Sequence, residues 1–221
     1  EPCTHYGKTP PCVQAIIDAG ISDVVYAIKD PNPLMKNRSA YDIFTEAGIS
    51  VRIGLCKELA YQLNRSYFYY HNNKKPYVIL KAATSLDGKV ALSTGESKYI
   101  TSEESLKKVH HLRSCVDAIV IGQNTVEMDQ AKLNVRYNML DDPALSPAKI
   151  IVCRDFKLAY DAPVFQQSDG QCIIASIKPV KEKQSKIDYW TLDNRDSIAW
   201  DQLLKKCYDK GFHSILIEGG T

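Results

Sequence analysis

Two cysteines near the amino end of the chain have the side-chain chemistry of a metal site. Cys3 follows a proline, and Cys12 begins an apolar periodic segment directly after Pro10 and Pro11. Thiolates bind zinc, and the backbone N–H groups at the start of a helix favour an anionic sulfur. His5 is a third donor by residue type, although a histidine in a loop often forms nothing more than a local hydrogen bond. Because two cysteines at this spacing are also often simply buried, the spacing by itself leaves the zinc site open.

A second group of candidate residues follows apolar strands in the later part of the chain. Lys81 lies at the end of one apolar run, and Glu218 ends another, directly before two glycines. Glycines after a strand let backbone N–H groups approach phosphate oxygens. A lysine at a strand end can reach a ligand, but it can also extend its ammonium group into solvent from an edge strand. Taken alone, a glutamate at a strand end is usually solvated, so these residues leave the ligand undefined.

The elements that must position these residues alternate between helices and apolar strands. The expected helices cover residues 12–20, 39–47, 57–70 and 199–210, with another opened by Thr101 and carrying Glu104 in capping-box spacing. The expected strands cover residues 22–28, 49–53, 77–83, 118–122, 149–153, 172–176 and 214–218. This alternation predicts parallel pairing through crossover connections, and therefore an α/β fold.

The polar stretch at residues 71–76 separates two apolar regions and marks the expected domain boundary, with domains at 1–73 and 74–221.

The chain has 221 residues, 44% hydrophobic and 24% charged, which excludes disordered, collagen-like and disulfide-scaffold proteins. Lys and Arg total 28 against 26 Asp and Glu, so no basic field favours nonspecific binding of nucleic acid.

The same composition gives expectations about compartment and redox state. No apolar run approaches the ~18 to 20 residues that cross a bilayer, and no signal segment opens the chain, so we expect a cytoplasmic enzyme without a membrane partner. The seven cysteines are odd in number and widely spread, so we expect most of them to be reduced and buried. The chain starts at Glu1 rather than Met and stops at Thr221 after two glycines, which suggests a segment lacking both ends of a longer polypeptide.

Several segments, taken in order, resemble the bifunctional deaminase/reductase family of riboflavin biosynthesis. Two segments resemble the deaminase part of that family: Glu-Pro-Cys-Thr-His-Tyr-Gly-Lys-Thr-Pro-Pro-Cys at residues 1–12 and Asp-Pro-Asn-Pro at 30–33. Five later segments resemble the reductase part: Lys-Ala-Ala-Thr-Ser-Leu-Asp-Gly at 81–88, Gly-Glu-Ser-Lys-Tyr-Ile-Thr at 95–101, His-Leu-Arg at 111–113, Gly-Gln-Asn-Thr-Val at 122–126 and Ile-Glu-Gly-Gly at 217–220. The resemblance covers essentially the whole chain.

For residues 1–73 the resemblance implies part of a cytidine-deaminase-like domain. Cys3 and Cys12 would be two of three protein ligands to zinc, whose bound water hydrolyses an amine from a ribosylated diaminopyrimidinone phosphate. The third ligand, a histidine, and the proton-shuttling glutamate belong to a His-x-Glu segment that would lie before residue 1. On this interpretation the segment as given does not deaminate.

For residues 74–221 the resemblance implies a dihydrofolate-reductase-like domain that uses NADPH to reduce the ribosyl chain of the deaminated product to ribityl. The implied catalytic residues are Lys81, Asp129 and Glu218. The implied substrate contacts are Ser97, Arg113, Leu133, Arg136 and Glu218, where an arginine fork matches phosphate oxygens. The implied cofactor contacts are Ala83, Tyr99, Thr125, Asp129, Arg154, Gly220 and Thr221.

Two departures from the family pattern and two alternatives qualify this interpretation. Tyr99 stands where relatives commonly carry tryptophan, and Asp129-Gln-Ala replaces their usual Asp-Asp-Pro. A protein that keeps only the reductase activity is one alternative, and a noncatalytic nucleotide-binding module on the same fold is another. The family also suggests a homo-oligomer acting on a small phosphorylated pyrimidine.

Overall fold

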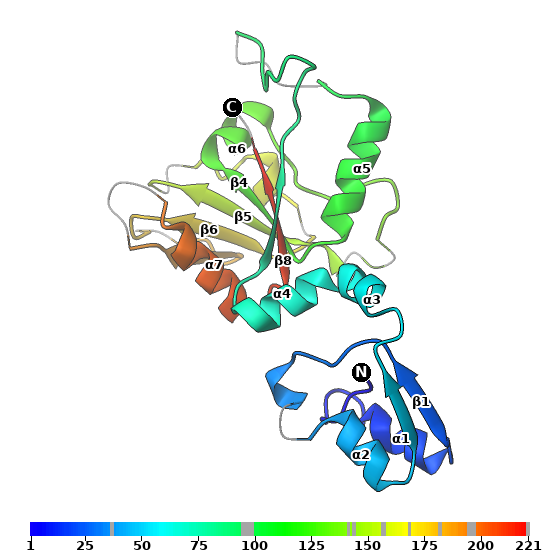
Figure 1. The fold of residues 1–221 in the computed structure, drawn as a ribbon. Coiled ribbons are helices and arrows are strands. Elements are labelled where there is room, and N and C mark those ends of the chain that lie inside the picture. The colour runs from blue at the N-terminus through cyan, green and yellow to red at the C-terminus, as the bar shows by residue number, and fades with distance from the viewer. Residues whose placement is uncertain are drawn as a thin grey trace. The chain divides into compact units, whose positions relative to one another are not determined.

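A computed structural model of the chain describes residues 1–35, 38–93, 100–140, 142, 145–155, 158–167, 169–180, 183–193 and 198–219 (Figure 1). The chain divides into two compact units, Glu1–Lys74 and Lys75–Thr221, so the division falls one residue after the boundary expected from the polar stretch. Both units combine helices with parallel strands, which confirms the α/β class.

The N-terminal unit is built around a two-stranded parallel sheet. Its elements are α1 (Cys12–Asp18), β1 (Asp23–Tyr26), η1 (Pro33–Met35), α2 (Ala40–Glu46), β2 (Ser50–Ile53), α3 (Lys57–Leu63) and α4 (Arg65–Asn73). The pairing sets Asp23 opposite Ser50. A small core of Val13, Phe44 and Ile49 packs α1 and α2 against the sheet.

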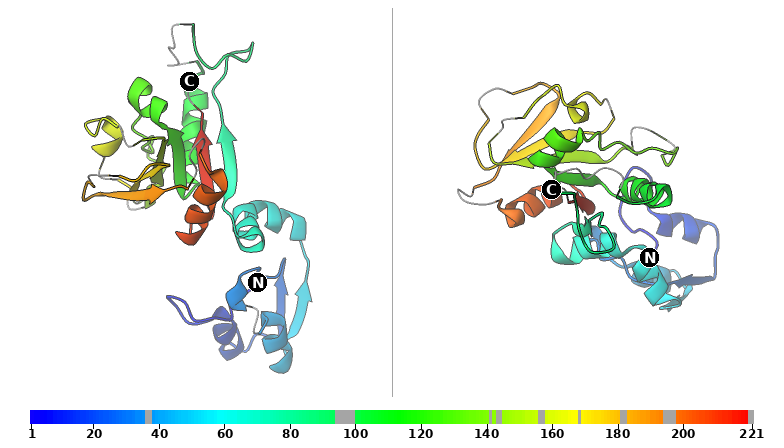
Figure 2. Two further views of the ribbon diagram at one scale, coloured as in Figure 1. Left: turned by 90° about the vertical axis from the view of Figure 1, so that its left-hand side faces the viewer. Right: turned by 90° about the horizontal axis from the view of Figure 1, so that it is seen from above.

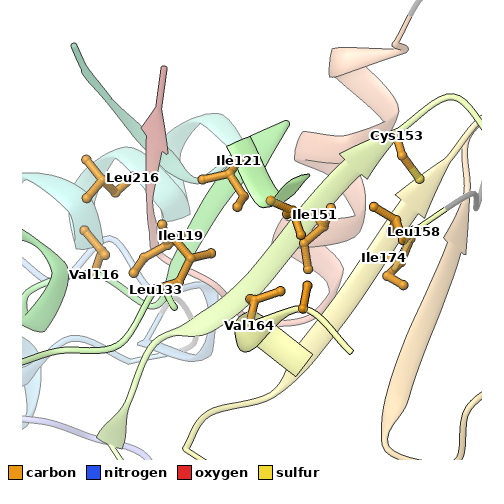
Figure 3. Close-up of a cluster of buried hydrophobic side chains, with 12 residues drawn as sticks. Val116, Ile119, Ile121, Leu133, Ile151, Cys153, Leu158, Val164, Ile174 and Leu216 are labelled. Carbon is orange, nitrogen blue, oxygen red and sulfur yellow. The ribbon is translucent and has the colours of Figure 1, made fainter. Parts of the chain in front are cut away.

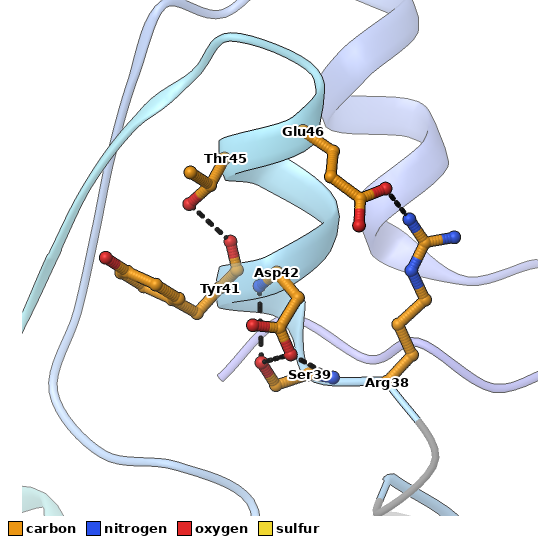
Figure 4. Close-up of polar contacts among 6 residues, drawn as sticks. All are labelled: Arg38, Ser39, Tyr41, Asp42, Thr45 and Glu46. Carbon is orange, nitrogen blue, oxygen red and sulfur yellow. Dashed lines mark hydrogen bonds and ion pairs between the residues drawn. The ribbon is translucent and has the colours of Figure 1, made fainter.

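Helix α2 begins with a complete capping box (Figure 4). The Ser39 hydroxyl accepts a hydrogen bond from the Asp42 N–H at 3.2 Å, and the Asp42 carboxylate accepts one from the Ser39 N–H at 3.3 Å. These bonds satisfy two of the N–H groups that a helix start leaves unpaired. Arg38 and Glu46 form an ion pair along the same helix. The local sequence is therefore sufficient to start this helix at the predicted place.

The single helix expected over residues 57–70 is wrong, because the structure has two helices that meet at Asn64. The backbone of Asn64 leaves helical geometry, at φ −111° and ψ 22°. Its side-chain amide donates to the Ala60 carbonyl at 3.0 Å, alongside the backbone N–H of the same residue at 3.2 Å. Asparagine side chains compete in this way with the helical ladder, which accounts for the break.

The C-terminal unit contains a six-stranded, fully parallel sheet in the order β3-β8-β4-β5-β6-β7. Its strands are β3 (Tyr77–Lys81), β4 (Ala118–Gly122), β5 (Ala148–Cys153), β6 (Cys172–Ser176), β7 (Ile187–Thr191) and β8 (Ser214–Glu218). Its helices are α5 (Glu103–Ser114), α6 (Gln123–Asp129), η3 (Pro163–Phe165) and α7 (Trp200–Asp209). The parallel pairing predicted from the sequence is confirmed.

The order in which successive strands are added to this sheet reverses once, and as a result helices pack on both faces of the sheet. From β4 to β7 each strand is added next to the previous one, whereas β8 returns to lie between β3 and β4. Because such crossovers are right-handed, the helix of the return connection lies on the opposite face from the others. Helix α7 accordingly packs on the face of Val120 and Ile150. Helix α6 packs on the other face, with Ile121 and Ile151, whose side chains are drawn in Figure 3. Figure 2 shows the ribbon from two further sides.

Three expectations about local elements differ from the structure. Helix α5 is capped by Ser102, whose hydroxyl accepts from the Ser105 N–H at 3.3 Å, and not by Thr101. Helix α6 was not predicted, because Val126 is its one buried residue and the segment has no apolar periodicity. Strand β7 was not predicted either, because it is a partly exposed edge strand with a charged residue at its second position.

The expected burial of most cysteines is also wrong. Cys153 and Cys207 are buried, while Cys12, Cys56 and Cys115 are exposed. Cys56 is the N-cap residue of α3 and Cys115 is the C-cap residue of α5, so both lie at helix ends, outside the apolar pattern that would indicate burial. Within the described part of the chain, no helix is long and apolar enough to cross a membrane.

Candidate functional site

The predicted site residues of the C-terminal unit gather at the carboxyl ends of the sheet strands. Lys81 ends β3 and is paired in register with Glu218, which ends β8. Thr125 and Asp129 lie on α6, which begins directly after β4. In a parallel sheet all strand ends of one kind meet at one edge, where ligands of α/β proteins bind next to a reversal in strand order. The position of β8 between β3 and β4 is such a reversal.

A cavity of about 220 Å³ opens at this edge. Among its lining residues are seven that the sequence predicted, namely Lys81, Ala83, Arg113, Thr125, Asp129, Leu133 and Glu218. The remaining lining is mostly apolar, and includes Val90, Ile100 and Ala131. The structure therefore brings these seven residues to one concave surface, which their spacing along the chain could not show.

Glu218 is the electrostatic centre of this cavity. Its carboxylate accepts two hydrogen bonds from Arg113, from Nε at 2.6 Å and from Nη2 at 2.9 Å, and Lys81 Nζ lies 3.8 Å from Oε2. Burial of the carboxyl opposes its ionisation. The hydrogen bonds and charge of Arg113, with the charge of Lys81, outweigh burial and hold the pKa of Glu218 below its ordinary value. The site therefore holds one buried anion between two cations.

A buried histidine that sequence reasoning missed lies behind this cluster. His110 is one turn before Arg113 on α5 and is 3% exposed. Its Nδ1 accepts a hydrogen bond from the backbone N–H of Arg136 at 3.2 Å. Burial, together with the charges of Arg113 and Arg136, lowers the pKa of His110 to about 4. The signal in the sequence is its spacing of three residues from Arg113, which places both on one helix face.

A second cavity, of about 330 Å³, adjoins the first through shared lining by Thr125, Glu218 and Gly219. It extends over the ends of β4 and β5, past Val152, to Trp200 at the start of α7. The lining is largely apolar, and the Trp200 ring is about half exposed. The first cavity therefore holds the charged cluster, and the adjoining second cavity is largely apolar.

The other predicted residues of this unit lie around the cavities or outside the described residues. Arg136 is exposed and does not line either cavity. Arg154 is exposed directly after β5, and its carbonyl accepts from the Ser176 hydroxyl at 2.9 Å. The predicted positions Ser97, Tyr99, Gly220 and Thr221 lie outside the described residues.

In the N-terminal unit the two cysteines proposed as metal ligands come together. The Cys3 and Cys12 sulfurs are 3.2 Å apart, and the Cys12 N–H donates to Cys3 Sγ at 3.1 Å. The hydrogen bonds from Cys3 lower the pKa of the Cys12 thiol. His5 does not complete the set, because its Nδ1 lies 3.2 Å from the Met35 sulfur. No cluster of three His, Cys, Asp or Glu side chains suited to a metal occurs in the described part of the chain.

Comparison with known proteins gives the C-terminal unit a family. The model of the RibD C-terminal domain family matches residues 76–221. The chain is 38% identical over 222 residues to the riboflavin biosynthesis protein RibD of Aquifex aeolicus, covering 100% of this chain and 61% of that protein. The chain thus spans about 60% of the length of this relative.

Solved structures agree with the sequence comparison. A crystal structure from Thermotoga maritima, described as a diaminohydroxyphosphoribosylaminopyrimidine deaminase/5-amino-6-(5-phosphoribosylamino)uracil reductase, matches with a TM-score of 0.88 at 31% identity. The match covers 100% of this chain and 60% of that one. RibD of Acinetobacter baumannii matches with a TM-score of 0.85 at 32% identity, covering 99% of this chain and 61% of that one.

Proposed function

Because the chain belongs to the RibD C-terminal domain family, we propose that it is an NADPH-dependent reductase of riboflavin biosynthesis. Its substrate is the compound named for the Thermotoga maritima relative, 5-amino-6-(5-phosphoribosylamino)uracil, and its reaction converts the ribosyl chain to ribityl. The observation that carries the proposal is the Lys81–Glu218–Arg113 cluster around the buried Glu218 carboxylate, in a cavity that shares lining residues with a second, largely apolar cavity.

The residues present fit a dinucleotide cofactor. The two cavities share Thr125, Glu218 and Gly219, so a single long ligand can occupy both. The apolar end near Trp200 offers a ring surface to an aromatic base, and Thr125 and Asp129 line the charged end. When bound, NADPH supplies a hydride to the sugar carbon that carries the nitrogen.

In this proposal Lys81 donates the proton that completes the reduction. Opening of the ribose ring leaves the sugar ring oxygen in need of a proton while the hydride goes to carbon, so the substrate gains one hydride and one proton. The Lys81 side chain lines the cavity at the end of β3, and its ion pair with Glu218 holds Nζ in position. Arg113 in turn orients the Glu218 carboxylate through two hydrogen bonds.

The test is NADPH oxidation by the protein in the presence of the phosphoribosylaminouracil. Lys81→Met should reduce kcat by about 100-fold, because general acid catalysis typically contributes that much or more, while NADPH still binds. Lys89→Met, at an exposed lysine of the loop after β3, is the matched control and should keep full activity. Binding of NADPH without any oxidation in the unsubstituted protein would instead support a noncatalytic nucleotide-binding module.

We also propose that the N-terminal unit is part of a cytidine-deaminase-like zinc domain, because the Cys3 and Cys12 thiols converge. These two residues would hold zinc together with a histidine and act with the glutamate of a His-x-Glu segment. Zinc when bound supplies an activated water for hydrolytic deamination. Titration with Co²⁺ should give a thiolate charge-transfer band, and absence of that band would contradict the proposal. The family resemblance further leads us to propose that the protein is cytoplasmic and forms a homo-oligomer. Sedimentation of the purified protein tests the oligomeric state.

A further inference from the structure

We propose that Cys3 and Cys12 form a reversible thiol–disulfide couple, in which a hydroperoxide oxidises the converged thiols to an intramolecular disulfide. The two sulfurs are in contact, 3.2 Å apart, within one compact unit of the chain. Formation of the bond requires no metal. Its consequence, that the oxidised chain cannot bind a metal through these sulfurs, rests on the zinc domain proposed above.

The two sulfurs are close enough to form a bond with little movement. A disulfide bond is about 2.05 Å long, so the sulfurs need to approach each other by only about 1.2 Å. The backbone beside them is already paired, because the Val13 N–H donates to the Cys3 carbonyl at 3.3 Å. The Cys12 N–H also donates to Cys3 Sγ at 3.1 Å. The two segments are therefore held side by side at the cysteines.

The segment that carries the first of these cysteines is anchored on both sides of it. Before the cysteine, the Glu1 carboxylate accepts from the Asp30 N–H at 2.6 Å and from the Ala40 N–H at 2.9 Å. After the cysteine, the Thr4 hydroxyl donates to the sulfur of the buried Met35 at 3.4 Å. Folding has therefore already closed the loop between the two cysteines, so little chain entropy remains to be lost when the bond forms.

The two sulfurs differ in access to solvent and in hydrogen bonding. Cys12 is exposed, whereas Cys3 is partly buried. The Cys3 thiol donates its hydrogen bond to the Cys12 sulfur. Cysteines that sense oxidants are accessible to solvent and lie next to a resolving cysteine. The geometry therefore assigns Cys12 to the reaction with the oxidant and Cys3 to the resolving step.

The reaction uses hydrogen peroxide as the oxidant and produces water. The Cys12 sulfur attacks one peroxide oxygen, the O–O bond breaks, and Cys12 becomes a sulfenic acid while a water molecule leaves. The Cys3 sulfur then attacks the Cys12 sulfur, the S–O bond breaks, and the hydroxyl group leaves with the Cys3 proton as a second water. Both sulfurs are thereby oxidised and the peroxide is reduced. A dithiol such as dithiothreitol reverses the step by thiol–disulfide exchange.

The test is peptide mapping of the purified chain after treatment with hydrogen peroxide and alkylation of the remaining thiols. Trypsin cleaves after Lys8 and so separates the two cysteines. We expect a peptide pair that joins Cys3 to Cys12, lighter than the two reduced peptides by two hydrogen atoms, which dithiothreitol separates. Cys56→Ser, at an exposed cysteine of the same unit, is the control and should form the same cross-link.

A second variant tests the order of the two steps. In Cys3→Ser the resolving thiol is absent, so dimedone should capture the Cys12 sulfenic acid at least about tenfold more than in the unsubstituted chain. Equal capture in the two proteins would overturn the proposal, as would a cross-link that joins Cys12 to a second chain. The cross-link should also form at least about tenfold faster in the folded chain than in urea, because the fold holds the sulfurs together. Equal rates would contradict a pair prepared by the fold.

Binding of Co²⁺ separates this proposal from that of the zinc domain. The oxidised chain should lose the thiolate charge-transfer band and regain it after reduction and removal of the reductant, because a disulfide has no thiolate to bind a metal. If the reduced chain shows no band, the zinc domain fails, and peptide mapping still decides whether the couple exists. A full band in a chain whose cross-link is complete would overturn the exclusion of the metal.

Discussion

Glu218 and Arg113 are two buried charges that depend on each other. The exposed fractions of their side chains are 8% and 12%, and two short hydrogen bonds join them. Removing one partner of a buried ion pair leaves the other charge without compensation, which costs more than the pair contributes as a whole. The same pair orients Lys81 in the proposed site, so its loss should affect both stability and activity.

We expect Glu218→Gln to lower the free energy of unfolding of the C-terminal unit by about 3 kcal/mol. Urea unfolding followed by tryptophan fluorescence measures this unit specifically, because both tryptophans, Trp190 and Trp200, lie in it. Asp209→Asn, which removes an exposed pair with Lys205, is the control and should cost less than about 1 kcal/mol. Equal losses of unfolding free energy in the two variants would show that the buried Glu218 pair stabilises the unit no more than an exposed ion pair does.

His110 should make the stability of this unit depend on pH. Its pKa is about 4 in the folded chain against an ordinary value of 6.5, so the unfolded chain binds a proton over that range that the folded chain excludes. The contribution of the neutral His110 ring to the free energy of unfolding is therefore complete above about pH 6.5. As the pH falls toward 4, the free energy of unfolding decreases by about 3 kcal/mol. In His110→Asn the fall between these pH values should be smaller by that amount. The measurement is the free energy of unfolding from urea titrations at several pH values, and parallel curves would contradict it.

The corner before β6 is a tightly constrained connection of the sheet. Lys149 of β5 is 1% exposed, and its Nζ donates to the Asp169 carbonyl at 2.7 Å and carboxylate at 2.8 Å. Gly170 follows with φ +70°, and a Cβ built there would lie 2.5 Å from the Pro147 carbonyl oxygen. Both the backbone angle and the close approach therefore require glycine at this corner.

Gly170→Ala should lower the free energy of unfolding of the C-terminal unit by about 3 kcal/mol or more, because strain in φ and a backbone clash act together. Gly211→Ala is the matched control, since Gly211 has φ +87° after α7 but open space around its Cβ position. That control should cost about 1 kcal/mol. The comparison uses the same urea titrations, and equal effects would mean that the corner relaxes around the added methyl group.

At the scale of the whole molecule, the chain carries two candidate sites, and each is built within one unit. The thiol pair lies in Glu1–Lys74, and the cavity with Glu218 lies in Lys75–Thr221. Each site depends on contacts inside its own unit. In the thiol pair the Cys12 N–H donates to the Cys3 sulfur. In the cavity, Lys81 and Glu218 are paired at the ends of β3 and β8, and Arg113 of α5 binds Glu218. The two chemistries should therefore be separable by substitution.

Cys3→Ser should remove the Co²⁺ charge-transfer band while leaving the affinity for NADPH within twofold of its original value. The physical reason is that serine removes one of the two converging thiols and no atom of the reductase cavity. Cys56→Ser, at an exposed cysteine of the same unit, is the control and should keep the band. Visible absorption and NADPH fluorescence are the two measurements, and a parallel change in both would contradict separate sites.

The α/β class, the parallel pairing and the main strands follow from the sequence, because the apolar runs that must be buried between helices can be identified residue by residue. The family resemblance also pointed to Lys81, Arg113 and Glu218 as site residues. It could not indicate that Arg113 binds Glu218, since the two are 105 positions apart and meet through sheet register and the packing of α5.

Features that depend on contacts between distant segments are visible in the folded chain alone. The short helix α6 and the edge strand β7 have weak or mixed local patterns, so packing against other segments determines them. The spacing of His110 from Arg113 indicates a shared helix face, but the hydrogen bond between His110 and the Arg136 backbone has no local signal, because the two residues are 26 positions apart. Periodicity reports which face of an element is buried, whereas a site is made by what the other elements bring to that face.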